Sequence, residues 1–151
     1  MISNEDYLWY VDTALDSMLG IVRSLGDDLA NRVPDLPGAN APYAILTHCL
    51  GVMAYWGGEV VAGRTIERDR PAEFVATGPV ADLVERAREA RRQFAIDVGV
   101  AEHDAPPRGA VPPADAAIPI GRTQGGALFH VYEELSQHLG QMEISRDMLQ
   151  R

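Results

Sequence analysis

The sequence predicts an all-α fold of four long helices. Apolar residues recur at intervals of three and four along four segments, which is the helical period, and no segment shows the alternation that is typical of a strand. Prolines mark the connections, with Pro34 after the first segment and five more prolines within 99–122. A chain of 151 residues is most simply one domain, here 1–151, and we find no internal repeat.

The first helix is predicted over 4–33. Its apolar stripe continues to the end of the segment, and Pro34 then stops it. Ser3 or Asn4 can cap the N-terminus, where Glu5 and Asp6 also favour the helix dipole.

The second helix is predicted over 40–63, with Asn40 as its N-cap and Pro42 in its first turn. It is apolar on almost every side, which indicates a central, buried helix. The connection that follows, as far as 79, is polar and is expected to have a partly ordered middle.

The third helix is predicted from Thr77 or Pro79 to about Val98, with a charged face toward solvent. The proline-rich segment 99–122 is predicted to be a long loop without regular helix, and such loops in compact proteins are often functional. The fourth helix is predicted to begin near Thr123, and its apolar positions continue to Met148.

Composition excludes several classes of protein. The formal net charge is −9, so there is no electrostatic footprint for nucleic acid and no basic patch for an anionic membrane. No apolar stretch is expected to approach the ~20 residues of a membrane span. Cys49, the only cysteine, excludes an internal disulfide, and the acidic N-terminus does not resemble a signal peptide, so we expect a cytoplasmic protein.

A metal site is suggested by histidines and a glutamate on two of the predicted helices. Residues four apart on a helix lie about 6 Å from each other, so Glu134 can share an ion with either His130 or His138. His130 and His138 are about 12 Å apart along the helix axis and cannot bind the same ion. His48, on the buried second helix, is the best candidate for a third ligand. Three protein ligands and an open fourth position are typical of catalytic zinc sites, although zinc, nickel, iron and manganese all suit these residue types.

Other conspicuous residues have simpler interpretations. Cys49 is expected to be a small buried hydrophobic residue, Tyr55 and Trp56 to belong to the core, and His103 to be exposed. Gly125 and Gly126 suit either the start of a helix or a close approach by a ligand or another backbone.

Two segments resemble the DinB-like superfamily. The spacing N-x7-H from Asn40 to His48 resembles its second helix, and HVYEELSQHLGQMEISRD resembles the fourth helix of its thiol-dependent branch, which includes mycothiol-dependent maleylpyruvate isomerase and mycothiol S-transferase-like proteins. The similarity covers essentially the whole chain, including the connection RDRPAEF. It implies an up-down-down-up four-helix bundle and a divalent metal held by His48, Glu134 and His138. Many relatives have R-H-x-G-H where this chain has Gln137 before His138 and Gln141 at the end of the motif.

The resemblance implies a thiol S-transferase or isomerase that acts on small electrophiles. The cofactors would be a divalent metal, zinc first and nickel as an alternative, and mycothiol or another low-molecular-weight thiol, whose deprotonation the metal favours. The alternatives are a metal-dependent hydrolase and a non-catalytic metal-binding bundle. A homodimer is a further expectation, because Trp9, Tyr10 and Leu19 lie beside the main apolar stripe of the first helix.

Overall fold

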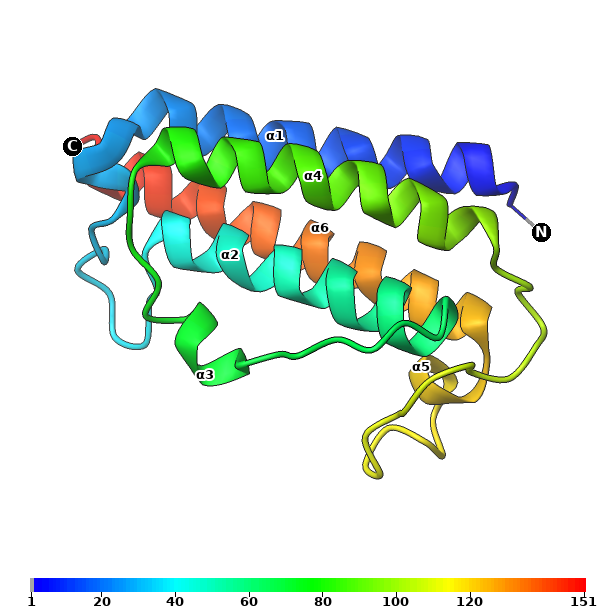
Figure 1. Cartoon of the computed structure of the whole chain (residues 1–151). Coiled ribbons are helices and arrows are strands. Elements are labelled where there is room, and N and C mark those ends of the chain that lie inside the picture. Colours follow the sequence, from blue (N-terminus) through cyan, green and yellow to red (C-terminus); the bar gives the residue numbers. More distant parts are fainter. Residues whose placement is uncertain (1) are drawn as a thin grey trace.

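The computed structural model describes residues 2–151, which form a four-helix bundle (Figure 1). The long helices α1 and α6 run in one direction, and the α2–η1 helix and α4 run in the other, so the topology is up-down-down-up. No strand occurs in residues 2–151, and the predicted all-α bundle is confirmed. The elements are, in order, α1 (Asn4–Ala30), α2 (Pro42–Val52), η1 (Met53–Val61), α3 (Arg70–Glu73), α4 (Val80–Gly99), α5 (Pro119–Arg122) and α6 (Gln124–Leu149).

Helix α1 begins where the sequence predicts but ends three residues earlier. The Ser3 hydroxyl accepts a hydrogen bond from the backbone N–H of Asp6 and caps the helix. Gly26 has a φ of 67°, a left-handed conformation that glycine adopts without steric cost, and it interrupts the helix one turn before its end. The side chain of Asn31 then bonds both the N–H and the C=O of Gly78. These bonds attach the end of α1 to the segment that leads into α4.

The α2–η1 helix lies at the centre of the bundle and is buried on nearly all sides, as predicted. The predicted N-cap at Asn40 is wrong, because Ala41 occupies the cap position and no side chain caps the helix. The expectation that no apolar stretch reaches membrane-spanning length is also wrong, since Pro42–Val61 has both the length and the hydropathy. However, 78% of its apolar window is buried inside the bundle, as expected for a core helix.

The second half of this central helix is a π-helix, which the periodicity did not predict. In η1 the backbone bonds reach five residues back, and the bond from Ala62 N–H to Gly57 C=O (3.0 Å) closes the last turn. Runs of π-helix are rare and are frequently found at functional sites. This one begins one turn after His48.

The connections around α3 and α5 are attached to the bundle by individual hydrogen bonds. The loop 100–118 is attached through Gln124, which is buried and bonds the backbone of Glu102 and Pro106. The prediction of no regular helix in 99–122 is wrong at Pro119–Arg122, where α5 forms one turn, and at Gly99, which ends α4.

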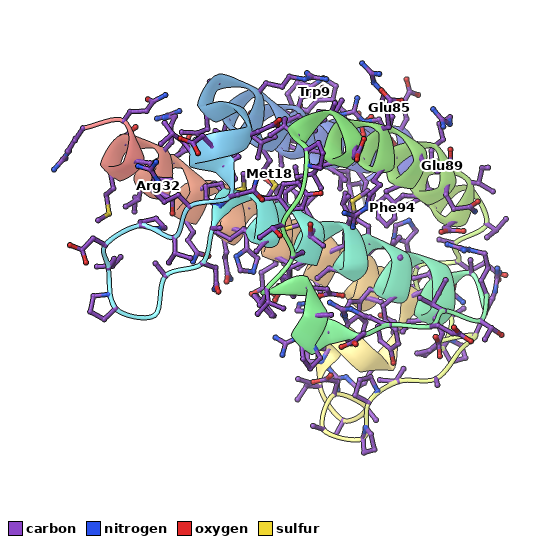
Figure 2. The ribbon with its side chains drawn as sticks, turned by 60° about the vertical axis from the view of Figure 1, so that its left-hand side comes forward. Trp9, Met18, Arg32, Glu85, Glu89 and Phe94 are labelled. Carbon is purple, nitrogen blue, oxygen red and sulfur yellow. The ribbon has the colours of Figure 1, made fainter. Side chains whose placement is uncertain are left out.

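Side chains divide clearly between core and surface. Figure 2 shows Met18 and Phe94 pointing between helices, whereas Trp9, Glu85 and Glu89 point away from the bundle. Trp9 is 62% exposed and packs edge-to-face on Tyr10. Leu19, which we placed with them beside the main apolar stripe, is instead buried in the core. Association of two copies through this face stays a prediction.

Candidate metal centre

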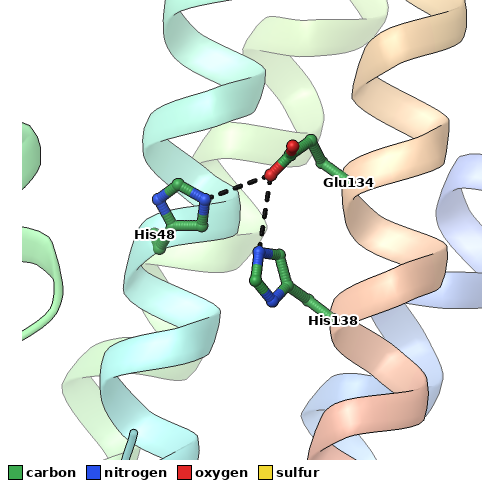
Figure 3. A group of neighbouring side chains, drawn as sticks. All are labelled: His48, Glu134 and His138. Carbon is green, nitrogen blue, oxygen red and sulfur yellow. Dashed lines mark hydrogen bonds and ion pairs between the residues drawn. The ribbon is translucent and has the colours of Figure 1, made fainter. Parts of the chain in front are cut away.

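His48, Glu134 and His138 come together between α2 and α6 (Figure 3). Both histidines approach the same carboxylate oxygen: His48 Nε2 lies 3.2 Å from Glu134 Oε2, and His138 Nε2 lies 3.4 Å from it. One ligand atom from each of the three residues lies within 4.8 Å of the other two. His48 is fully enclosed by the helix packing, while Glu134 and His138 are partly accessible.

The other nitrogen of each ring bonds a second residue. His48 Nδ1 lies 2.8 Å from the Oε2 atom of Glu73 in α3, and His138 Nδ1 lies 2.9 Å from Gln141 Oε1 one turn further along α6. A carboxylate oxygen and an amide oxygen only accept hydrogen bonds, so each Nδ1 carries the hydrogen. In a neutral ring, the lone pair of Nε2 is then left facing Glu134.

Glu134 lies in surroundings that favour its ionised form. The contact with His138, and then that with His48, hold the pKa of the Glu134 carboxyl well below its usual range. In turn, the Glu134 carboxylate raises the pKa of His138. The cluster is therefore an anion between two imidazoles, and it is balanced either by protons on the rings or by a cation.

The donor set fits a divalent transition metal. Two neutral imidazole nitrogens and one carboxylate oxygen are the ligands of many catalytic zinc sites, and imidazole also suits nickel and iron. The outer hydrogen bonds from each Nδ1 to Glu73 and Gln141 resemble those that orient metal-binding histidines in general. That these residues bind a metal stays a prediction, but the geometry fits one.

His130 does not join the cluster. Its Nε2 lies 3.8 Å from Glu134 Oε1, and its Nδ1 faces Glu133 at 3.2 Å. Of the two pairs that the spacing allowed, Glu134 and His138 are the pair that meets His48. Cys49, beside His48, points into the core as predicted, and burial raises the pKa of its thiol.

A cavity of about 260 Å³ opens beside the cluster. Its walls come from four parts of the chain, and its lining includes Val52, Tyr55, Trp56, Arg68, Arg70, Pro112, Asp115, Ile120 and His130, with His48 and Glu134. Tyr55 and Trp56, which we expected in the core, are thus part of the cavity wall, although Trp56 is otherwise buried. The proline-rich loop also contributes to this wall, and the Tyr55 hydroxyl donates a hydrogen bond to the Ala110 carbonyl of that loop.

Two other sequence expectations are revised near the loop. His103 is half-buried rather than exposed, and its Nε2 lies 2.7 Å from Asn4 Oδ1. A Cβ at Gly125 would lie 2.9 Å from the His103 carbonyl oxygen, and a Cβ at Gly126 would overlap the Pro119 carbonyl. The two glycines therefore allow a close approach of backbone, not of a ligand.

Three residues of the site were missed by sequence reasoning. Glu73 and Arg68 were assigned to a polar connection without a role, and Gln141 was noted only as a departure from the relatives' motif. A signal for Glu73 existed, since the sequence D-R-P-A-E is a capped, proline-initiated helical turn. Nothing local, however, indicates that this turn lies against His48.

The bundle topology together with the His–Glu–His cluster defines a DinB-like protein. Within that class the comparison is specific: the family model described as Mycothiol-S-transferase matches residues 7–150, and the chain belongs to this family. No curated protein and no solved structure matches the chain.

Proposed function

We propose that the protein is a divalent-metal-dependent S-transferase that joins mycothiol, or a similar low-molecular-weight thiol, to a small electrophile. The observation that carries the proposal is the cluster itself. Two imidazole nitrogens and a carboxylate oxygen lie within 4.8 Å of one another, at the side of a cavity that His48 and Glu134 line. Membership of the Mycothiol-S-transferase family supports a thiol as that molecule.

His48, Glu134 and His138 would hold the metal, zinc first and nickel as the alternative. A divalent cation at this position lowers the pKa of a thiol that coordinates it, so that the thiolate is available at neutral pH. Glu73 and Gln141 keep both Nε2 atoms directed at the ion. A cytoplasmic location is part of the proposal, since a single reduced cysteine suits that compartment. Association into a homodimer is also part of it.

The cavity lining contains both apolar residues and hydrogen-bond donors that can contact the thiol and the electrophile. Val52, Trp56 and Ile120 form an apolar side that limits access of water to a bound electrophile. Arg68 and Arg70 line the same cavity and provide hydrogen-bond donors for the polar parts of a thiol or substrate. Tyr55 fixes the loop that closes one wall.

The test is thiol-dependent turnover by protein purified without chelators or a histidine tag. The purified protein is assayed for metal and then incubated with mycothiol and monochlorobimane. The thiolate sulfur displaces chloride from the bimane carbon, and the resulting thioether is fluorescent. We expect product only with metal present, and a change in the visible spectrum of the Co²⁺-loaded protein when mycothiol is added. His48→Ala should remove both signals.

Two results would contradict the proposal. One is an unchanged Co²⁺ spectrum on addition of mycothiol, together with no thiol-dependent product. The other is hydrolysis of an activated ester at the same rate with and without thiol, which would instead indicate water as the molecule at the open position.

A further inference from the structure

We infer that Glu73, held by Arg68, is a positioning residue of the metal centre, and that the segment 68–74 belongs to the site instead of being a connection. The inference rests on the metal centre of the proposed function and adds residues outside the ligand cluster. Figure 1 shows this segment, with α3 at its centre, lying alongside α2.

Local residues stabilise the single helical turn α3, which carries Glu73. The Asp69 side chain accepts a hydrogen bond from the Ala72 N–H, and Pro71 lies in the first turn, where its missing N–H costs nothing. The turn directs two successive residues toward α2. Glu73 reaches His48 Nδ1, and the Phe74 ring stacks on the imidazole with 4.5 Å between centroids.

Helix α2 leaves space for the carboxylate. Gly51 lies three residues after His48 on the same helix face, and a Cβ there would lie 2.7 Å from Glu73 Cδ and overlap Oε1. Any larger residue at position 51 would therefore displace the carboxylate from His48. The position of Glu73 beside His48 therefore requires a glycine at position 51.

Arg68 completes the arrangement by occupying the remaining acceptor positions. Its Nε donates to Glu73 Oε1 at 2.7 Å and its Nη2 donates to Oε2 at 2.9 Å. This fork fixes the carboxylate plane, and such charge-assisted pairs are strong and directional. The Glu73 side chain is 9% exposed and that of Arg68 is 15% exposed, so the pair is shielded from water.

The consequence concerns which nitrogen of His48 binds the ion. A carboxylate can only accept, so Nδ1 must carry a hydrogen and Nε2 must present its lone pair to Glu134 and to a metal. With an amide in place of Glu73, Arg68 would take the amide oxygen, and the NH₂ group would face Nδ1. That arrangement favours hydrogen on Nε2, and a ring in that form cannot bind the ion through Nε2.

Glu73→Gln is the direct test, with two readouts. We expect Co²⁺ affinity, measured by absorbance against a competing chelator, to fall about 10- to 100-fold, the usual effect of removing an outer partner of a metal-binding histidine. The second readout is the His48 Nδ1–H signal in ¹⁵N NMR spectra of the Zn²⁺-loaded protein. The wild type should show this signal, whereas in Glu73→Gln it should be lost or should exchange rapidly with solvent. Gly51→Ala keeps the side chains of Glu73 and Arg68 but displaces the carboxylate. It should therefore also lower the Co²⁺ affinity and weaken the His48 Nδ1–H signal.

A matched control separates positioning from stability. Asp97 is also a buried carboxylate held by an arginine, since Arg64 donates to its two oxygens at 2.9 and 2.7 Å, but it contacts no histidine. Asp97→Asn should therefore lower stability while Co²⁺ affinity and the His48 signal stay as in the wild type.

Wild-type Co²⁺ affinity or an intact His48 Nδ1–H signal in folded Glu73→Gln protein overturns the inference. Equal loss of affinity in Asp97→Asn also overturns it, because the effect would then be a general loss of stability. Neither readout involves a thiol, so the inference can fail while thiol transfer stands, and the reverse.

Discussion

Three acceptor atoms converge at the cluster, and this determines which single residues matter there. When both rings are neutral and each Nδ1 carries the hydrogen, His48 Nε2, His138 Nε2 and Glu134 Oε2 face one another with no hydrogen between them. Acceptors in such contact repel unless positive charge lies among them. Replacing a histidine of the cluster is therefore expected to weaken metal binding much more than replacing His130, which lies outside the cluster.

His138→Ala and His130→Ala form the residue-scale prediction. Removing His138 leaves two ligands, so the loss of Co²⁺ affinity should exceed the about 10- to 100-fold typical of an outer partner. His130→Ala should leave the affinity close to that of the wild type, because its nearest contact with Glu134 is 3.8 Å long and its Nδ1 faces Glu133. Absorbance titration of both variants measures this.

The opposite ranking of these two variants would show that the metal uses the other register. The four-residue spacing alone predicted that Glu134 pairs with one of the two histidines but could not say which. The choice depends on where α2 places His48 relative to α6, and this is a property of the packed bundle. Glu73 was missed for the same reason, since it lies 25 residues from His48 in sequence.

At the scale of elements, the change from α- to π-helix after Val52 is the least predictable feature. Apolar residues surround the Pro42–Val61 helix on every side, so no stripe reveals its period. Helix α1 begins at its expected start, and α4 and α6 begin within three residues of theirs, because caps and prolines mark them locally. Helix ends that depend on distant partners, such as Asn31 on Gly78, were misplaced.

Gly57→Ala tests whether the packing of η1 requires a residue without a side chain. A Cβ at Gly57 would lie 2.6 Å from Cδ2 of Phe94, whose ring is buried and cannot move away freely. Overpacking of this kind costs about 1–3 kcal/mol, so the free energy of unfolding in urea should fall by that amount.

Gly20→Ala in α1 is the matched control. Apart from the adjacent backbone of α1 itself, no atom of the described residues lies within 4 Å of a Cβ at that position. The residue is inside a regular helix, so stability should rise by about 0.5–1 kcal/mol. A Gly57→Ala protein as stable as the wild type would mean that η1 can relax toward an ordinary α-helix.

At the scale of the whole molecule, the proposed ion would link two helices that the chain connects only through long segments. His48 belongs to α2 and the other two ligands to α6, and more than eighty residues separate them in the sequence, so the unfolded chain does not hold the three together. A ligand that binds the folded protein alone stabilises it by mass action. At a free Zn²⁺ concentration of about 100 times the dissociation constant, the gain is about 2.7 kcal/mol.

This gain should appear as a higher melting temperature. One kcal/mol corresponds to about 2–4 °C for a chain of this size, so Zn²⁺ should raise the Tm of chelator-treated protein by roughly 5–10 °C. His138→Ala should show almost no increase, and Mg²⁺ should not replace Zn²⁺, because Mg²⁺ prefers oxygen ligands and keeps its waters. Scanning calorimetry at fixed protein concentration measures the shift. An unchanged Tm in wild-type protein that equilibrium dialysis shows to be loaded would mean that the ion binds elsewhere or binds the unfolded chain equally well, and the cluster between α2 and α6 would then not be its site.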